Sequence, residues 1–225
     1  MNALNTKTAW TLTSVTVALA VALAMTACSS PPTAADLDKL TASTIASSFR
    51  VEGIAKVDRL VQDDSNRECS QAEASGKPLT AERAKAIETA NLTTVKLPSD
   101  GKYLGDWREG EKIAQNGRGM TWTDPTTAPG GGNCYNCHQI SPQEISFGTL
   151  GPSLYQYGRL RGVIDPASTV AKPIVDYTWG KLWNAKAYNA CSAMPRFGHA
   201  KLLNEKQIQD VMALLLDPKS PVNNP

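Results

Sequence analysis

The run Cys134-Tyr135-Asn136-Cys137-His138 constrains this chain more than any other feature of its sequence. It is a Cys-x-x-Cys-His pattern, in which two thiols three positions apart can each add to a vinyl group of one haem. The histidine that follows the second cysteine can then give an imidazole nitrogen to the iron. The pattern therefore predicts one covalently bound haem c.

Two other kinds of site also use closely spaced cysteines, a thioredoxin-like redox pair and half of a zinc site. The first lacks a flanking βαβ pattern in this sequence, and the second lacks another cysteine or histidine pair at ligand spacing. Both alternatives are therefore disfavoured.

The N-terminus indicates export. Lys7 is the sole charge before Asp36, residues 10–24 are almost all apolar or small, and residues 22–27 offer small side chains to a signal peptidase. We expect a signal peptide over residues 1–27 and a periplasmic location. The alternative of a transmembrane anchor is disfavoured because the apolar stretch is shorter than the roughly 20 residues of a bilayer span.

Met25-Thr26-Ala27-Cys28 resembles a bacterial lipobox, except that Met25 stands where leucine is usual. Lipidation of Cys28 would tether the exported protein to a membrane. Ordinary cleavage nearby remains the alternative.

The remaining cysteines predict a disulfide. The chain has five cysteines, of which Cys134 and Cys137 belong to the haem pattern and Cys28 lies at the processing site. Cys69 and Cys191 are left, and two spare thiols in an oxidising compartment favour a disulfide between them. The alternative is two unpaired buried thiols, because sequence alone does not show whether they approach each other.

The exported chain divides into three parts. We expect a tether and helical N-terminal extension over residues 28–99, a haem domain over residues 100–217, and a polar tail over residues 218–225 that has no packing capacity. The predicted helices cover residues 81–91, 108–115, a stretch beginning at Asp165-Pro166, 177–187 and 205–216, and residues 62–66 are predicted to form a turn. No period-2 pattern indicates strands, so the predicted fold class is all-α.

The charge balance excludes one class of partner. Lysine and arginine total 23 against 21 acidic residues, which gives a net charge of +2 at pH 7, and no basic run or nucleic-acid-binding motif is present. We therefore expect no nucleic-acid partner. The glycine run at residues 130–132 is not a phosphate-binding loop, because Lys-Ser/Thr does not follow it. We expect these glycines to give the backbone conformational freedom beside the haem edge.

The second axial ligand of the iron has four candidates, Met194, Met120, Met212 and His199. Met212 lies on the apolar face of the last predicted helix and is expected in the core. Met120 precedes the haem motif, whereas a chain that encircles a haem usually brings its second ligand from downstream. His199 remains an alternative.

Met194 is favoured by its surroundings. Pro195 holds the chain extended and removes a competing N–H group, and Phe197 can pack against the porphyrin. A thioether ligand raises the reduction potential and occupies the last iron position. Such a site would transfer electrons and bind no substrate at the iron.

From Gly105 to Asp217 the layout resembles a class I cytochrome c, with a helix, the haem motif, a Gly-Pro-x-Leu segment, a methionine loop and a C-terminal helix. The resemblance implies that fold for the haem domain. It also implies that the Pro152 carbonyl accepts the proton of the second ring nitrogen of His138.

Three segments together resemble the SoxX family, the monohaem subunits of SoxAX sulfur-oxidation cytochromes; they are residues 132–138, 148–154 and 193–198. The resemblance implies an electron-accepting role in a complex that joins thiosulfate to a cysteine of a sulfur-carrier protein, an L-cysteine S-thiosulfotransferase. Its implied partners are a SoxA-like haem subunit, which would perform the sulfur chemistry, and a downstream cytochrome acceptor. No catalytic residue is expected in this chain.

The alternative function is a free-standing electron carrier, periplasmic or lipid-tethered. A ring of lysines around the haem edge would favour transient docking to a partner. Lys181, Lys186, Arg196 and Lys201 flank Met194, and we interpret them as solvated charges.

Overall fold

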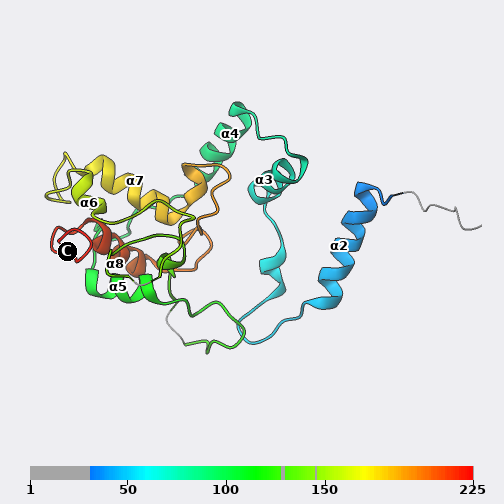
Figure 1. Ribbon diagram of the computed structural model, residues 1–225, viewed down its shortest axis with the longest axis horizontal. Coiled ribbons are helices and arrows are strands. Elements are labelled where there is room, and N and C mark those ends of the chain that lie inside the picture. The colour runs from blue at the N-terminus through cyan, green and yellow to red at the C-terminus, as the bar shows by residue number, and fades with distance from the viewer. Residues whose placement is uncertain (1–30, 128–129, 145, 225) are drawn as a thin grey trace, which may run out of the picture. The chain divides into compact units, whose positions relative to one another are not determined.

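The computed structural model describes residues 31–127, 130–144 and 146–224. The chain divides into two compact units, one ending at Phe49 and the other beginning at Arg50. Within the first unit, helix α2 spans Ala34–Ser48 (Figure 1). The side chains of Thr33 and Asp36 form a capping box at its start. None of its residues is buried.

The second unit is helical. Its elements are η1 (Val57–Leu60), α3 (Asp64–Ser75), α4 (Ala81–Leu92), α5 (Trp107–Gln115), η2 (Cys134–Asn136), α6 (Tyr157–Leu160), α7 (Lys172–Trp183), η3 (Ala185–Ala187) and α8 (Glu205–Leu216). The described residues form no β-strand, only an isolated bridge between Glu52 and Ala55. The all-α prediction is confirmed. The unit begins at Arg50 and therefore includes α3 and α4, and α4 packs on η3.

The helices predicted at residues 81–91 and 205–216 are confirmed, because both have strong N-terminal signals. The Thr80 hydroxyl accepts a hydrogen bond from the Arg83 N–H at the start of α4. Asn204 and Gln207 form a capping box at the start of α8.

Two local predictions were wrong. Residues 62–66 contain the start of α3, because the Asp63 carboxylate caps that helix by accepting from the Asn66 N–H. No helix begins at Asp165, whose carbonyl and carboxylate instead hold the next residues in a turn. Helix α7 begins at Lys172, with Pro173 in its first turn.

Helices α5 and α8 cross at close range (Figure 1). A Cβ atom at Gly110 would lie 2.1 Å from the Asp210 carbonyl oxygen, so only glycine permits this approach. The Asp210 carboxylate accepts from the Asp106 N–H at 2.7 Å, and the Gly105 N–H donates to the Gln209 carbonyl at 2.8 Å. These contacts fix the start of α5 on the middle of α8.

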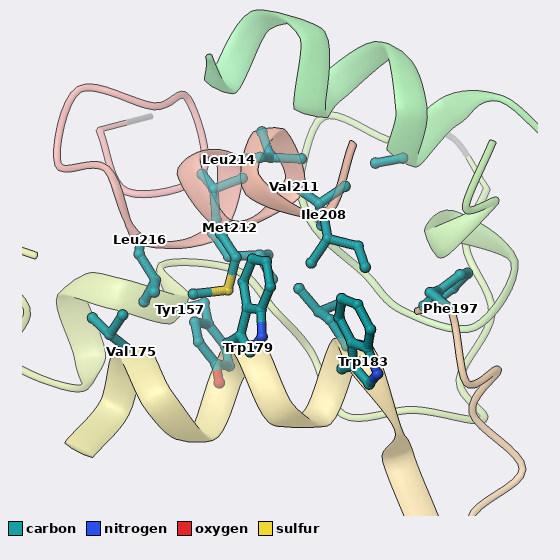
Figure 2. Close-up of a cluster of buried hydrophobic side chains, with 14 of the residues drawn as sticks. Tyr157, Val175, Trp179, Trp183, Phe197, Ile208, Val211, Met212, Leu214 and Leu216 are labelled. Carbon is teal, nitrogen blue, oxygen red and sulfur yellow. The ribbon is translucent and has the colours of Figure 1, made fainter. Parts of the chain in front are cut away.

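The core lies between α7 and α8. Figure 2 shows Trp179 of α7 beside Met212 of α8, and both side chains are fully buried. Trp179 stacks on Trp183 with ring centroids 5.8 Å apart. Their indole N–H groups donate to the Lys96 and Thr94 carbonyls, so the segment after α4 is held against α7.

The predicted lack of packing at residues 218–225 was wrong. Ser220 is fully buried, and Val222 is 2% exposed. The Asn223 side chain accepts from the Gly158 and Arg159 N–H groups and donates to the Leu215 carbonyl. An amide whose polar atoms are all hydrogen-bonded can be buried, so the polar composition of this segment did not mean exposure.

Within the part of the chain that the structure describes, no helix is both long and apolar enough to cross a bilayer. The predicted signal peptide and Cys28 lie outside the described residues.

Candidate functional site

The Cys-x-x-Cys-His motif forms a tight turn. It begins at Asn133, whose backbone is left-handed at φ 47°, and continues as the short helix η2. The N–H groups of Cys137 and His138 both donate to the Cys134 carbonyl, at 3.1 and 2.9 Å. This turn brings the two thiols and the imidazole together on one short segment.

The preceding loop is held under the end of α5. The Gly132 N–H donates to the Ile113 carbonyl at 2.8 Å, and the Asn133 N–H donates to the Asn116 carbonyl at 3.0 Å. A Cβ atom at Gly131 would lie 1.8 Å from the Asn116 carbonyl oxygen. At Gly131 the absence of a side chain therefore lets the backbone of the loop lie directly against the end of α5.

The segment after the motif returns alongside it. Three N–H groups, from Gly148, Gly151 and Leu154, donate to the carbonyls of Tyr135, Cys137 and Gln139, at 2.8, 2.8 and 2.7 Å. These bonds place the Gly-Pro-x-Leu segment directly against the Cys-x-x-Cys-His motif, although His138 and Pro152 are 14 positions apart in sequence.

His138 Nδ1 lies 2.6 Å from the Pro152 carbonyl oxygen. A carbonyl can only accept a hydrogen bond, so Nδ1 must carry the proton and Nε2 keeps its lone pair for a metal. A Cβ atom at Gly151 would lie 2.1 Å from His138 Cε1, so the ring packs directly on this glycine. The tautomer and the ring orientation are therefore both fixed by this segment.

The two motif thiols are not joined to each other. Burial raises the pKa of the Cys134 thiol to about 12. A reactive cysteine of the thioredoxin type needs a lowered pKa, so the environment of Cys134 argues against that alternative. Among the residues that the structure describes, no group of three or more His, Cys, Asp or Glu side chains could hold a metal ion.

Met194 lies at the edge of the same core as the motif. It is partly buried and packs against the core cluster, as do Cys134, Tyr135 and Leu154. Phe197, which follows in the same loop, is 5% exposed and belongs to that cluster.

The alternative axial ligands lie in other settings. Met212 is fully buried in α8, as predicted for a core residue. His199 is exposed, and its backbone N–H donates to the Trp183 carbonyl at 3.0 Å. Met120 lies in a loop that contacts η1, where its carbonyl accepts from the Arg59 guanidinium at 2.6 Å.

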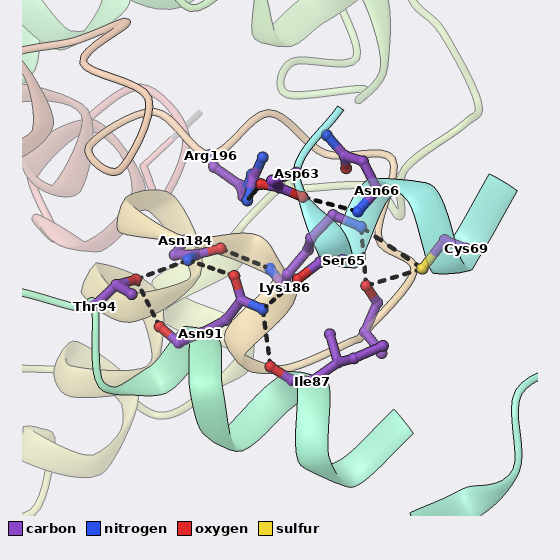
Figure 3. Close-up of polar contacts among 11 residues, drawn as sticks. Asp63, Ser65, Asn66, Cys69, Ile87, Asn91, Thr94, Asn184, Lys186 and Arg196 are labelled. Atoms are coloured by element: carbon purple, nitrogen blue, oxygen red, sulfur yellow. Dashed lines mark hydrogen bonds and ion pairs between the residues drawn. The ribbon is translucent and has the colours of Figure 1, made fainter. Parts of the chain in front are cut away.

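The methionine loop is fastened by two side-chain links, a disulfide to α3 and an ion pair to the residue that caps α3, and Figure 3 shows the ion pair. The predicted Cys69–Cys191 disulfide is confirmed, with the two Cα atoms 5.4 Å apart. Arg196 forms an ion pair with Asp63 at 2.6 Å. Burial raises the pKa of Asp63, but the Asn66 N–H and the Arg196 guanidinium outweigh burial and hold that pKa below its usual value.

The interpretation of the flanking cations as solvated charges was wrong for three of them. Lys186 is 5% exposed, and its ammonium donates to the Ala190 carbonyl at 2.9 Å. Lys181 is half-buried and donates to a backbone carbonyl of η3, and Arg196 forms the ion pair with α3's N-terminal cap. Among the four, Lys201 is exposed.

Sequence reasoning missed a buried amide network under this loop. The Asn184 side-chain amide donates to the Asn91 side-chain oxygen Oδ1 and to the Thr94 hydroxyl, both at 2.9 Å (Figure 3). Asn184 is fully buried and also caps η3. The network joins α4 to the chain that leads into the methionine loop, and no sequence motif marks it.

A comparison with known protein families finds no match. The chain is similar to a protein of Aquifex aeolicus (strain VF5) named "Uncharacterized lipoprotein", with 39% identity over 133 residues. The matched region covers 58% of this chain and 58% of that relative. The chain therefore spans less than two thirds of the relative's length.

Proposed function

We propose that this protein is a monohaem c-type cytochrome that transfers electrons. The observation that carries the proposal is the motif turn, in which two thiols unbonded to each other stand beside a histidine whose Nε2 is left free. A covalent haem needs two such thiols and an axial imidazole, and these residues fit it. When bound, the haem supplies reversible one-electron exchange.

The chain's own residues would have separate roles. Cys134 and Cys137 would form the thioether bonds, and His138 would be the proximal ligand, oriented by Pro152. Met194 is proposed as the second ligand. The disulfide and the Arg196 ion pair would restrain the Met194 loop, which favours a saturated iron over an open one.

We further propose that the chain is the electron-accepting subunit of a SoxAX-type complex, which supports the enzyme activity of that complex without containing its catalytic residue. The support is the resemblance of the three motif segments to the SoxX family. Joining thiosulfate to a carrier cysteine releases two electrons, and one haem holds one, so this subunit would relay them singly. A SoxA-like subunit, a sulfur-carrier protein and a downstream cytochrome would be its partners.

The second candidate is a free-standing carrier tethered through Cys28. The name of the Aquifex aeolicus relative, a lipoprotein, favours the tether, and the location would be periplasmic. The tether is compatible with either function.

Affinity purification of the exported chain from its natural host tests the choice between the two. A second haem protein that co-elutes in constant proportion through a salt wash would support the complex. The purified pair should couple thiosulfate to a carrier thiol, and this chain alone should not. Elution as a single haem protein would favour the free-standing carrier, and coupling by the chain alone would contradict the division of roles.

Met194→Ala tests the axial ligand. The sulfur-to-iron charge-transfer band of the oxidised protein should disappear in this variant and persist in His199→Ala, which serves as the matched control. An unmodified protein that lacks the sulfur-to-iron band, with a haem spectrum that changes in His199→Ala and not in Met194→Ala, would assign the ligand to His199.

A further inference from the structure

A groove of about 690 Å³ lies between α3, α4 and the chain at residues 186–192. Both disulfide cysteines line it. None of the proposed haem-binding residues lines it, so the groove is separate from the proposed haem site.

The two sulfur-bearing residues differ in their surroundings. Cys191 is exposed, whereas Cys69 is half-buried. The Lys186 ammonium lies 3.8 Å from Cys69 Sγ, and Lys186 is itself buried (Figure 3). An incoming group therefore reaches Cys191 more easily, and a negative charge is better accommodated on Cys69.

We propose that this groove is a thiol–disulfide exchange site that accepts a cysteine thiolate from a protein segment. The incoming sulfur attacks Cys191 Sγ and forms a new S–S bond. The Cys69–Cys191 bond breaks, and its electron pair leaves on Cys69 as a thiolate beside the Lys186 ammonium. A lower pKa of the leaving thiol accelerates exchange, and a neighbouring cation lowers that pKa.

The second half of the exchange needs no other oxidant. A second thiolate of the same partner attacks its own mixed-disulfide sulfur and releases Cys191 as a thiolate. The partner dithiol has then become a disulfide, and Cys69 and Cys191 have become thiols. Two electrons have passed from the partner to this chain.

The setting of Lys186 supports its role. Burial, and then the charge of Arg196, lowers the pKa of Lys186, and the attraction of Asp63 only partly opposes them. The Lys186 ammonium donates to a neutral carbonyl and to the Cys69 sulfur. A buried ammonium that lacks a full counter-charge is stabilised by a thiolate at Cys69, and it stabilises that thiolate in turn.

The groove walls favour a peptide over a small acidic thiol. Amide and hydroxyl side chains, which can hydrogen-bond to an extended backbone, line it at Gln62, Asn66, Ser70, Asn189 and Ser192. Glu73 and Glu88 also line it, and their charges repel an anionic thiol such as glutathione. The expected substrate is a cysteine flanked by neutral or basic residues.

The experiment exposes the folded, oxidised chain to a lysine-flanked cysteine peptide, quenches with N-ethylmaleimide and maps the products by mass spectrometry. We expect the peptide on Cys191 and the maleimide on Cys69. A glutamate-flanked peptide and glutathione should react several-fold more slowly. Lys186→Met should slow exchange by at least about tenfold, since leaving-group stabilisation is lost, and Lys186→Arg should restore most of the rate.

Three outcomes would overturn the proposal. They are a peptide attached mainly to Cys69, an unchanged rate in Lys186→Met, and no exchange in the unmodified chain. Faster reaction of glutathione than of the basic peptide would overturn the choice of substrate. If the Lys186 variants do not fold, the position of the peptide on the unmodified chain still decides.

Discussion

Removal of the Cys69–Cys191 disulfide should destabilise the protein strongly, because the bond joins residues that are 122 positions apart. In the chain-entropy relation, closing a loop of this length lowers the unfolded-state entropy by an amount worth about 4.9 kcal/mol at 25 °C. We therefore expect the double variant Cys69→Ser/Cys191→Ser to lose about 4–5 kcal/mol, or less where the unfolded chain stays compact.

Removal of the disulfide should loosen the methionine loop before it unfolds the helices. Without the disulfide, the Arg196–Asp63 ion pair would remain as the other side-chain link between that loop and α3. An ion pair with one partly exposed partner restrains a loop weakly. The variant should therefore lose the sulfur-to-iron band at a lower urea concentration than it loses its helical signal.

Urea unfolding of the oxidised protein, followed by circular dichroism, measures the effect. Ser70→Ala is the matched control, because Ser70 is exposed on the same helix and its loss should change the unfolding free energy by no more than about 0.5 kcal/mol. A loss below about 1 kcal/mol in the double variant, with an unchanged m-value, would refute the loop-closure reasoning.

Three further perturbations test other parts of the molecule. Because the pKa of Asp63 is lowered in the folded protein, its carboxylate stabilises the fold above the usual pKa of 3.8, and this stabilisation is lost as pH falls through the lowered pKa. The difference in unfolding free energy between the wild type and Asp63→Asn should therefore shrink as the solution is acidified. A difference that grows in acid would contradict the lowered pKa. Gly151→Ala places a Cβ atom 2.1 Å from the proximal imidazole and should yield a mixed-spin haem spectrum, whereas Leu150→Ala, at a residue 87% exposed, should not; identical spectra would contradict the packing argument. Asn223→Ala leaves the buried Gly158 N–H group unpaired and removes the amide that donates to the Leu215 carbonyl, and it should cost about 2–4 kcal/mol in urea unfolding, against almost nothing for the exposed Asn224→Ala. Equal effects would contradict the buried role of the tail.

Elements with strong local signals were predictable from sequence. Thr80 and Asn204 cap their helices with their own side chains, so the start of α4 and of α8 depended on neighbouring residues alone. The disulfide followed from counting cysteines in a chain that was predicted to be exported.

Elements that depend on distant partners were not predictable. The start of α3 looked like a turn, because Asp63 and Asn66 favour turns and helix caps alike. The polar tail is buried because Asn223 pairs with the backbone of α6, which no pattern in residues 218–225 indicates. Lys186 was expected in solvent, but the structure buries it. Its ammonium donates to the Ala190 carbonyl, four residues away, and lies beside Cys69 of α3, which is distant in sequence.

The candidate site was predictable where its residues are adjacent in sequence. The motif itself and the loop of Met194 were found by pattern. Asp63 and Cys69, in the N-terminal extension, fasten the Met194 loop. Of these two contacts, the sequence indicated only the disulfide, because Cys69 had no other assigned role. The hydrogen bond from His138 to Pro152 was expected from the resemblance alone, and the structure places those two groups 2.6 Å apart.

Intact-mass spectrometry of the chain, produced in a host that matures c-type cytochromes, tests whether haem is covalently bound at the Cys-x-x-Cys-His turn. We expect the mass of the polypeptide plus one haem, retained after denaturation and acid–organic extraction. Cys134→Ala/Cys137→Ala should lose it, and Cys69→Ser/Cys191→Ser should keep it. A chain that carries no haem under these conditions, or one whose haem is fully extracted, would rule out covalent haem at this turn.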